Sequence, residues 1–295
     1  GALSAPTTPE LRWLTETELR DGYRLACQAV IESDVVVVVP EESRLSRVSV
    51  LSKGVRRSVQ LDPWVERHTF RVPEATLKDQ ISDLENVTRS WQARNSSQFT
   101  PTLRALRQLP LALREQGGQI TVIVVDDRVV RIEAGEGPER VLGMAFDIGT
   151  TTVVGYLLDL ETGQQMAVSS LLNPQTRYGD DVVSRIGFCS EDSGLETLRR
   201  EIVGAVNKIV ADVTQVPWVP PEDIFGVTVV GNTTMLQLFL GINPGALARS
   251  PYVPAATAAM QFTAEELGIA AYPDAHVWAL PRIAGWVGAD AVGDM

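Results

Sequence analysis

FDIGTTTVVGYLLDLETG, residues 146–163, joins two apolar runs through a short polar segment. The first run ends in an acidic residue, Asp147, which is followed by Gly149 and then by three threonines. The chain turns apolar again in VVGYLLDL, residues 153–160. Two strands that follow each other so closely form an antiparallel hairpin, with the polar residues gathered at its turn.

The polar residues of this hairpin suit a phosphate ligand. An aspartate at the end of a buried strand is costly to desolvate, so it needs a metal, water or hydrogen-bond donors. Gly149 lets the backbone turn sharply and approach a ligand, and Thr150, Thr151 and Thr152 offer hydroxyl and N–H donors. We therefore expect the turn to bind phosphate and Asp147 to be catalytic, acting on Mg²⁺ through water. From these residues alone, a turn with only local hydrogen bonds stays an alternative.

The segments around the hairpin predict an α/β domain. Strands are expected at 141–149, 152–160 and 164–172, and their short connections make them antiparallel neighbours. A helical crossover follows, and then a strand at 224–232. A helix at 233–242, TTMLQLFLGI, is expected to begin on hydroxyl caps.

The N-terminal half alternates between helices and strands. A helix is predicted at 8–19, where threonine, proline and glutamate form its start, and a strand at 35–40 ends at Pro40. A further helix is expected at 100–115 and a hairpin at 119–135, with two aspartates at its turn. Short strands are also expected at 47–52, 57–62 and 68–73.

Three further helices are expected, at 76–92, 179–188 and 193–215, and apolar residues at helical spacing support the first and the last. The helix at 76–92 has Leu77, Ile81, Leu84 and Val87 in its apolar stripe. The helix at 193–215 has Leu195, Leu198, Ile202, Val206, Ile209 and Val213 in its apolar stripe.

The best domain boundary lies at residues 134–140, AGEGPER. This segment combines glycine, proline and charge between two strands.

Composition limits the classes of function. The 295 residues are 44% hydrophobic, with a mean hydropathy of +0.03, which is typical of a globular chain of about two domains. A net charge of −11 argues against binding to nucleic acid or to an anionic membrane. The longest apolar run, five valines, is far shorter than the roughly 20 residues of a membrane span.

The cysteines and the two ends of the chain favour a cytoplasmic piece of a longer protein. Two cysteines, Cys27 and Cys189, cannot build a disulfide framework, and the start lacks a signal-peptide pattern. The first residue is not methionine and the last residues stop inside a glycine-rich stretch. We therefore expect truncation at both ends.

The hairpin and the order of the strands resemble the first phosphate motif of the ASKHA superfamily of acetate and sugar kinases, Hsp70 and actin. Three further segments, NPQTRYGDDVVSRI, VTVVGNTTMLQLFLGINP and LPRIAGWVGADAV, resemble the reductive activators of corrinoid proteins. ATLKDQISDLENV and GGQITVIVVDDRVVRIEAGE are similar to the middle region of the same family. The resemblance covers almost the whole chain.

This resemblance implies an α/β fold, with an α+β middle region, in three parts. Residues 1–42 would be the C-terminal part of a β-grasp [2Fe–2S] ferredoxin domain, and 43–140 a linker or small α/β middle domain. Residues 141–295 would be the first half of an RNase H-like ASKHA domain, truncated before its adenosine-binding segment. We therefore expect weak nucleotide binding by this chain alone and no activity without the rest of the protein.

The segment GYRLACQ, residues 22–28, resembles the tail of a plant-type [2Fe–2S] domain. The resemblance makes Cys27 the last of four cysteine ligands, and the other three would lie before residue 1. Without the resemblance, Cys27 would be a small buried apolar residue. Cys189 is expected to be structural.

Other polar residues have weaker assignments. Asp180 and Asp181 begin a predicted helix, where the helix dipole explains them, although the resemblance raises a role for one of them at the active site. Asn232 and Thr233 are candidate ligand contacts in the ASKHA connecting motif. Gly288 and Asp290, in GWVGAD, occupy the place of the second phosphate motif but depart from its usual order. The isolated histidines, His68 and His276, have no metal-ligand spacing.

The resemblance predicts the function of the full protein. It would use ATP and Mg²⁺ to drive an electron from its [2Fe–2S] cluster to a corrinoid protein, which returns Co(II) to Co(I). An ASKHA small-molecule kinase and a non-catalytic ferredoxin-like adaptor are the alternatives. The expected partners are a corrinoid protein and an electron donor protein or low-potential reductant, and a homodimer stays open.

Overall fold

The computed structural model describes residues 3–25, 28–34, 61–215 and 218–281. The chain divides into two units, Gly1–Leu51 and Ser52–Met295. The predictions for Cys27, for the strands at 35–40, 47–52 and 57–60, and for Gly288 and Asp290 lie outside the described residues. In the described part, no helix is both long and apolar enough to cross a lipid bilayer.

The first unit contains two short helices, α1 (Thr8–Trp13) and α2 (Glu16–Arg20). The prediction of one helix over 8–19 is therefore wrong between Trp13 and Glu16. The break occurs because Thr15 and Glu18 form a capping box that starts a new helix. An ion pair between the buried Glu10 and the half-buried Arg24, at 2.8 Å, ties α1 to the chain that follows α2.

The second unit begins with a small antiparallel sheet in the order β1-β2-β3. Its strands are β1 (Val65–Arg71), β2 (Gln119–Val125) and β3 (Arg128–Ala134). The helices α3 (Asp83–Gln92) and α4 (Leu103–Arg114) pack on it, followed by the 3₁₀ turn η2 (Gln116–Gly118). The hairpin predicted at 119–135 and the helix predicted at 100–115 are confirmed.

Helix α3 begins later than predicted. Residues 76–81 are not helical, because Ser82 and Glu85 form a capping box that starts the helix at Asp83. Upstream, Thr76 and Asp79 close a separate turn through paired backbone hydrogen bonds. Leu77, placed on the apolar stripe by its spacing, is consequently 92% exposed.

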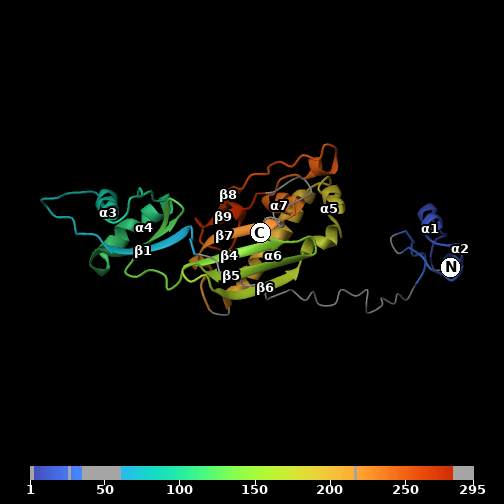
Figure 1. The fold of residues 1–295 in the computed structure, drawn as a ribbon, viewed down its shortest axis with the longest axis horizontal. Coiled ribbons are helices and arrows are strands. Elements are labelled where there is room, and N and C mark those ends of the chain that lie inside the picture. The colour runs from blue at the N-terminus through green and yellow to red at the C-terminus, as the bar shows by residue number, and fades with distance from the viewer. Residues whose placement is uncertain (1–2, 26–27, 35–60, 216–217, 282–295) are drawn as a thin grey trace. The chain divides into compact units, whose positions relative to one another are not determined.

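The larger sheet has six strands in the order β6-β5-β4-β7-β9-β8, and Figure 1 shows them in this order. Strands β4, β5 and β6 are antiparallel neighbours, as predicted, and β7 and β9 join parallel to β4. The mixed α/β class is therefore confirmed. The strands are β4 (Leu142–Ile148), β5 (Thr152–Asp159), β6 (Gln165–Leu172), β7 (Ile224–Gly231), β8 (Met260–Thr263) and β9 (His276–Ala279).

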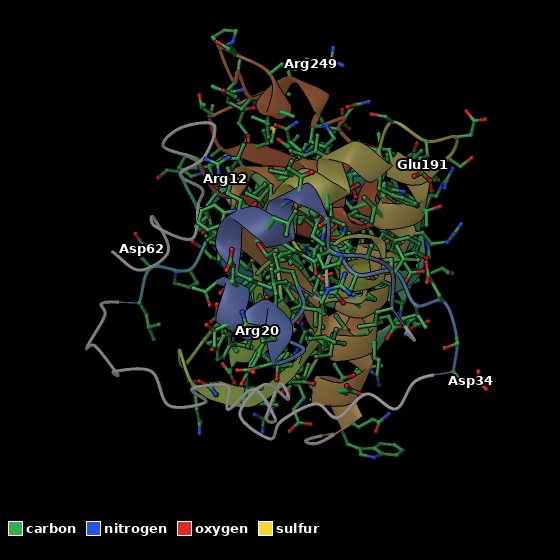
Figure 2. The ribbon with its side chains drawn as sticks, turned by 90° about the vertical axis from the view of Figure 1, so that its right-hand side faces the viewer. Arg12, Arg20, Asp34, Asp62, Glu191 and Arg249 are labelled. Carbon is green, nitrogen blue, oxygen red and sulfur yellow. The ribbon has the colours of Figure 1, made fainter. Side chains whose placement is uncertain are left out.

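Helices cover one face of this sheet and form the main core. Helix α6 packs against β5 and β6, and Gly155 on β5 lets the helix approach closely at Ile209. Charged side chains such as Glu191 and Arg249 lie exposed at the periphery of this unit (Figure 2). The helices are α5 (Val182–Phe188), α6 (Gly194–Gln215), α7 (Thr233–Leu240) and α8 (Ala264–Leu267), with 3₁₀ turns η3 (Pro174–Tyr178), η4 (Pro221–Asp223) and η5 (Gly245–Ala248).

Candidate phosphate-binding site

The turn between β4 and β5, residues 149–151, lies where two parallel strands end. Ile148, the last residue of β4, pairs with Gly231, the last residue of β7. The carboxyl ends of parallel strands are the usual location of ligand sites in α/β folds. The polar turn after β4 and the polar residues after β7 therefore meet at one edge of the sheet.

Three successive carbonyl groups of the turn are held by the protein. The side-chain amide of Asn173 donates to the carbonyl of Gly149 at 2.8 Å, and its backbone N–H donates to that of Thr151 at 2.8 Å. The guanidinium of Arg185 donates to the carbonyl of Thr150 at 2.6 Å. Both Asn173 and Arg185 are fully buried, so these bonds form on the inner side of the turn.

This arrangement determines where the N–H groups of the turn point. In a planar trans peptide, the C=O of one residue and the N–H of the next point in opposite directions. Since the carbonyls of Gly149 and Thr150 point at buried side chains, the N–H groups of Thr150 and Thr151 point away from them. Among the described residues, no protein acceptor is recorded for these two N–H groups. Successive backbone N–H groups presented in this way form an anion-binding concavity.

Asp147 is exposed, so the expectation that it is a buried carboxylate is wrong. Its neighbours Phe146 and Ile148 face the buried core, while Asp147 pairs in register with Val154 and Val230 on the opposite face of the sheet. The strand alternation explains the difference, because successive side chains point to opposite faces. An exposed carboxylate beside the turn still suits Mg²⁺ bound through water.

The connecting motif after β7 contacts the turn directly. The side-chain amide of Asn232 donates to the hydroxyl of Thr150 at 3.1 Å. The side-chain oxygen of Asn232 also accepts from the N–H of Met235, so Asn232 caps α7. The expected hydroxyl cap is therefore wrong, and Thr233 is instead buried in the first turn of the helix.

Asp181, the second residue of the acidic pair at 180–181, is explained by a helix start. Asp181 accepts from the N–H of Ser184 at 2.7 Å and caps α5. This bond to the backbone of Ser184 lowers the pKa of Asp181, so the carboxylate stays charged in its cap. Asp180 is exposed. The helix-dipole explanation therefore fits Asp181.

Cys189 and the two histidines lie apart from the turn. Burial raises the pKa of the Cys189 thiol to about 11, which keeps it protonated and inert. His68 contacts Glu66 at 2.7 Å and His276 contacts Asp126 at 3.0 Å. Within the described ranges, no cluster of three potential metal ligands among His, Cys, Asp and Glu is found.

Two residues that hold the turn, Asn173 and Arg185, were not identified from the sequence. Their segment, NPQTRYGDDVVSRI, contributed only to the family resemblance. Arg185 precedes the apolar Ile186 in a short helix, and both are buried. The position of Arg185 beside the apolar side of a predicted helix was the signal that could have identified it as a buried charged residue.

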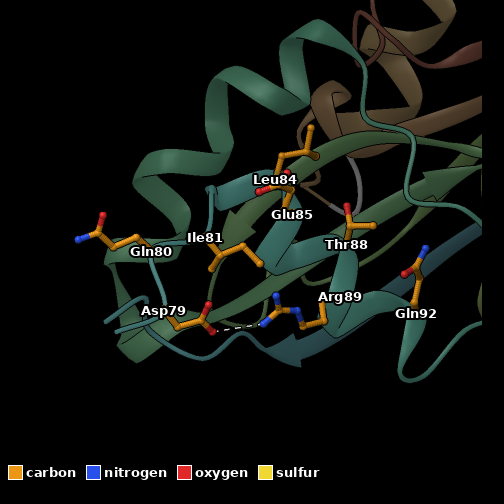
Figure 3. A pocket seen from close by; sticks show the side chains of 8 residues that line it. All are labelled: Asp79, Gln80, Ile81, Leu84, Glu85, Thr88, Arg89 and Gln92. Carbon is orange, nitrogen blue, oxygen red and sulfur yellow. Dashed lines mark hydrogen bonds and ion pairs between the residues drawn. The ribbon is translucent and has the colours of Figure 1, made fainter. Parts of the chain in front are cut away.

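A groove of about 690 Å³ lies elsewhere, on α3 and the segment before it (Figure 3). Its charged residues already have local partners. Arg89 contacts Asp79 at 3.3 Å, and Glu85 belongs to the capping box of α3. The groove is open and shares no residue with the turn, so the candidate site stays at the end of β4.

Comparisons with known proteins identify the family to which the chain is similar. A family profile described as the RACo middle region matches residues 142–295, and one described as the RACo linker region matches residues 54–138. The chain is similar to the corrinoid activation enzyme RamQ of Eubacterium limosum, with 28% identity over 269 residues. That alignment covers 90% of this chain and 44% of RamQ.

A solved structure is also similar. It is described as a reductive activator for corrinoid, iron–sulfur protein and has 32% sequence identity and a TM-score of 0.75. The match covers 94% of this chain and 47% of that chain. The chain thus spans about half the length of both relatives.

Proposed function

This chain belongs to the RACo family, and from that premise we propose that it is part of a protein that reductively activates a corrinoid protein. The two relatives described above support this proposal, since their descriptions name corrinoid activation. The partner would be a corrinoid protein whose cobalt has been oxidised to the inactive Co(II) state. The full protein would reduce this cobalt to Co(I) with one electron.

We further propose that the turn at 149–152 binds the phosphates of ATP. The observation that carries this proposal is the anchoring of three successive carbonyls by Asn173 and Arg185, which presents backbone N–H groups to an anion. Bound Mg²⁺ would neutralise phosphate charge, and Asp147 would orient it through water. Binding of ATP would then favour one conformation of the protein, and its differential affinity could drive an uphill electron transfer.

The electron donor in this proposal is a [2Fe–2S] cluster of the longer protein. A cluster of this type needs four ligands, and this chain has two cysteines, of which Cys189 is buried with a protonated thiol. The residues present therefore cannot hold the cluster alone. We propose Cys27 as one ligand, which an altered visible absorption spectrum of Cys27→Ser in the full-length protein would test.

The unpaired thiol of Cys189 supports a reducing compartment, and we propose the cytoplasm. Neither histidine is assigned a role in this function. An electron donor protein or a low-potential reductant would supply electrons to the [2Fe–2S] cluster.

The test is ATP hydrolysis by the full-length protein with and without a corrinoid protein. We expect the corrinoid protein to change the rate, and Asp147→Asn to lower it by roughly 10²-fold, as for the loss of one preorganised electrostatic contact. Because Asp147 is exposed, thermal stability should stay at the wild-type value. Glu161→Gln, in the turn that follows β5, is the matched control and should hydrolyse ATP normally. Wild-type hydrolysis by Asp147→Asn would remove Asp147 from the site.

A further inference from the structure

A fully buried arginine lies directly behind the proposed phosphate turn. Arg185, on α5, has no exposed surface. Its guanidinium donates to the carbonyl of Thr150 at 2.6 Å, to the carbonyl of Gly179 at 2.9 Å and to the side-chain oxygen of Gln175 at 3.4 Å. The sulfur of Met235 lies 3.1 Å away. All four partners are uncharged.

The positive charge of Arg185 therefore lacks a direct counter-ion. In the described part of the chain, no carboxylate is recorded within ion-pair distance of it. Burial lowers its pKa, and Asp180 and Asp181, which act at longer range from exposed positions, oppose this effect. An arginine side chain nevertheless stays protonated in proteins. A buried charge without a counter-ion is costly, so a compensating anion would stabilise it.

We propose that Arg185 is the buried counter-charge and positioning residue of the phosphate site. This inference rests on the proposed binding of ATP at the turn. Arg185 fixes the carbonyl of Thr150, so it orients the N–H of Thr151 toward the side of the turn where phosphate would lie. Its charge, one peptide unit behind the turn, also favours an anionic ligand over a neutral one.

The inference predicts a specific dependence on ligand charge. The phosphates of ATP would compensate Arg185, whereas adenosine, which has no phosphate, would not interact with it. The ratio of the affinities for ATP and adenosine is therefore the quantity that Arg185 sets. A residue that only stabilises the fold would change both affinities together or neither of them.

The test measures the Kd of ATP with Mg²⁺, and of adenosine, for the full-length protein by titration calorimetry. Arg185→Met and Arg185→Gln remove the charge at similar volume. We expect them to raise the Kd of ATP by about tenfold or more, because the charge behind the turn and the fixed orientation of the Thr151 N–H are both lost. The Kd of adenosine should change by less than about twofold. Arg185→Lys, which keeps the charge, should recover part of the affinity for ATP.

Arg131→Met is the matched control. Arg131 is also largely buried, but it pairs with Asp223 at 3.0 Å and packs against Phe225, near the start of β7 and away from the turn. This variant should lose stability without changing the ratio of ATP to adenosine affinity. The comparison separates the removal of a buried arginine from the removal of charge at the site.

Wild-type ATP affinity in either neutral Arg185 variant would overturn the inference, as would an equal loss of ATP and adenosine. Should neither neutral variant fold by circular dichroism, Arg185→Lys decides. One ammonium group cannot reproduce the guanidinium geometry toward Thr150 and Gly179, so unchanged ATP affinity would overturn the positioning role. If Asp147→Asn weakens ATP binding and the Arg185 variants do not, only this inference fails. Absence of ATP binding by the wild-type protein would instead remove the proposed function.

Discussion

Replacing Gly155 with alanine should destabilise the second unit by overpacking the contact between β5 and α6. A Cβ atom at this position would lie 2.6 Å from the Cγ2 of Ile209 and 2.7 Å from the Cε1 of Phe146. Carbon atoms in ordinary contact lie about 3.5–4.0 Å apart, so a neighbour must move by roughly 1 Å. Both neighbours are buried in the main core. Overpacking of this kind costs about 1–3 kcal/mol.

Thermal unfolding followed by circular dichroism measures the effect. For a unit of this size, each kcal/mol lowers Tm by about 2–4 °C. Gly204→Ala is the matched control, because Gly204 is exposed on α6 and nothing lies within 4 Å of the place that a Cβ atom would take there. This control variant should be more stable than the wild-type protein by about 0.5–1 kcal/mol. Ile209→Ala should relieve the clash, so the double variant should lose less stability than the sum of the two single variants. Unfolding of Gly155→Ala at the wild-type Tm or above would refute the packing argument.

Two further predictions concern ionisable groups. The side-chain hydrogen bond from Arg24 is the main cause that lowers the pKa of Glu10 from 4.5 to about 2. The carboxylate therefore stabilises the first unit above pH 4.5, and this contribution is lost as the pH falls from 4.5 toward 2. Glu10→Gln should lack this pH dependence in thermal unfolding. An identical dependence of Tm on pH in the variant and the wild-type protein would contradict the prediction. The protonated, buried thiol of Cys189 should react with iodoacetamide at pH 8 far more slowly in the folded protein than in urea. The labelling is measured by mass in a Cys27→Ser background, and equal rates in the two conditions would disprove the burial argument.

The sequence predicted the elements whose pattern is long or whose connections are short. The hairpin at 146–163 has a turn too short for anything but antiparallel strands, and β4 and β5 form as expected. Helix α6 carries an apolar stripe over its whole length, and the stripe from Leu198 to Val213 is buried. In both cases the local pattern and the tertiary packing require the same conformation.

Elements whose pattern is short or ambiguous were not predicted correctly. Strands β8 and β9 have four residues each, too few to show an alternation. Leu77 has helical spacing with Ile81, but the local capping box at Ser82 decides where α3 begins. Strand alternation could have placed Asp147 on the exposed face of the sheet, because the adjacent Phe146 is the bulky apolar residue that must face the core.

The residues of the candidate site could not be predicted to lie together from their spacing in the sequence alone. The turn after β4 is held by Asn173 from the end of β6, by Arg185 from α5 and by Asn232 from the end of β7. These residues are far apart in the sequence, and the sheet order brings their segments to one edge. A hairpin on its own would leave its carbonyls to water and could orient its N–H groups in several ways. The anchored turn is therefore a property of the assembled sheet and crossover, because the residues that hold it come from the segments NPQTRYGDDVVSRI and VTVVGNTTM rather than from the hairpin itself.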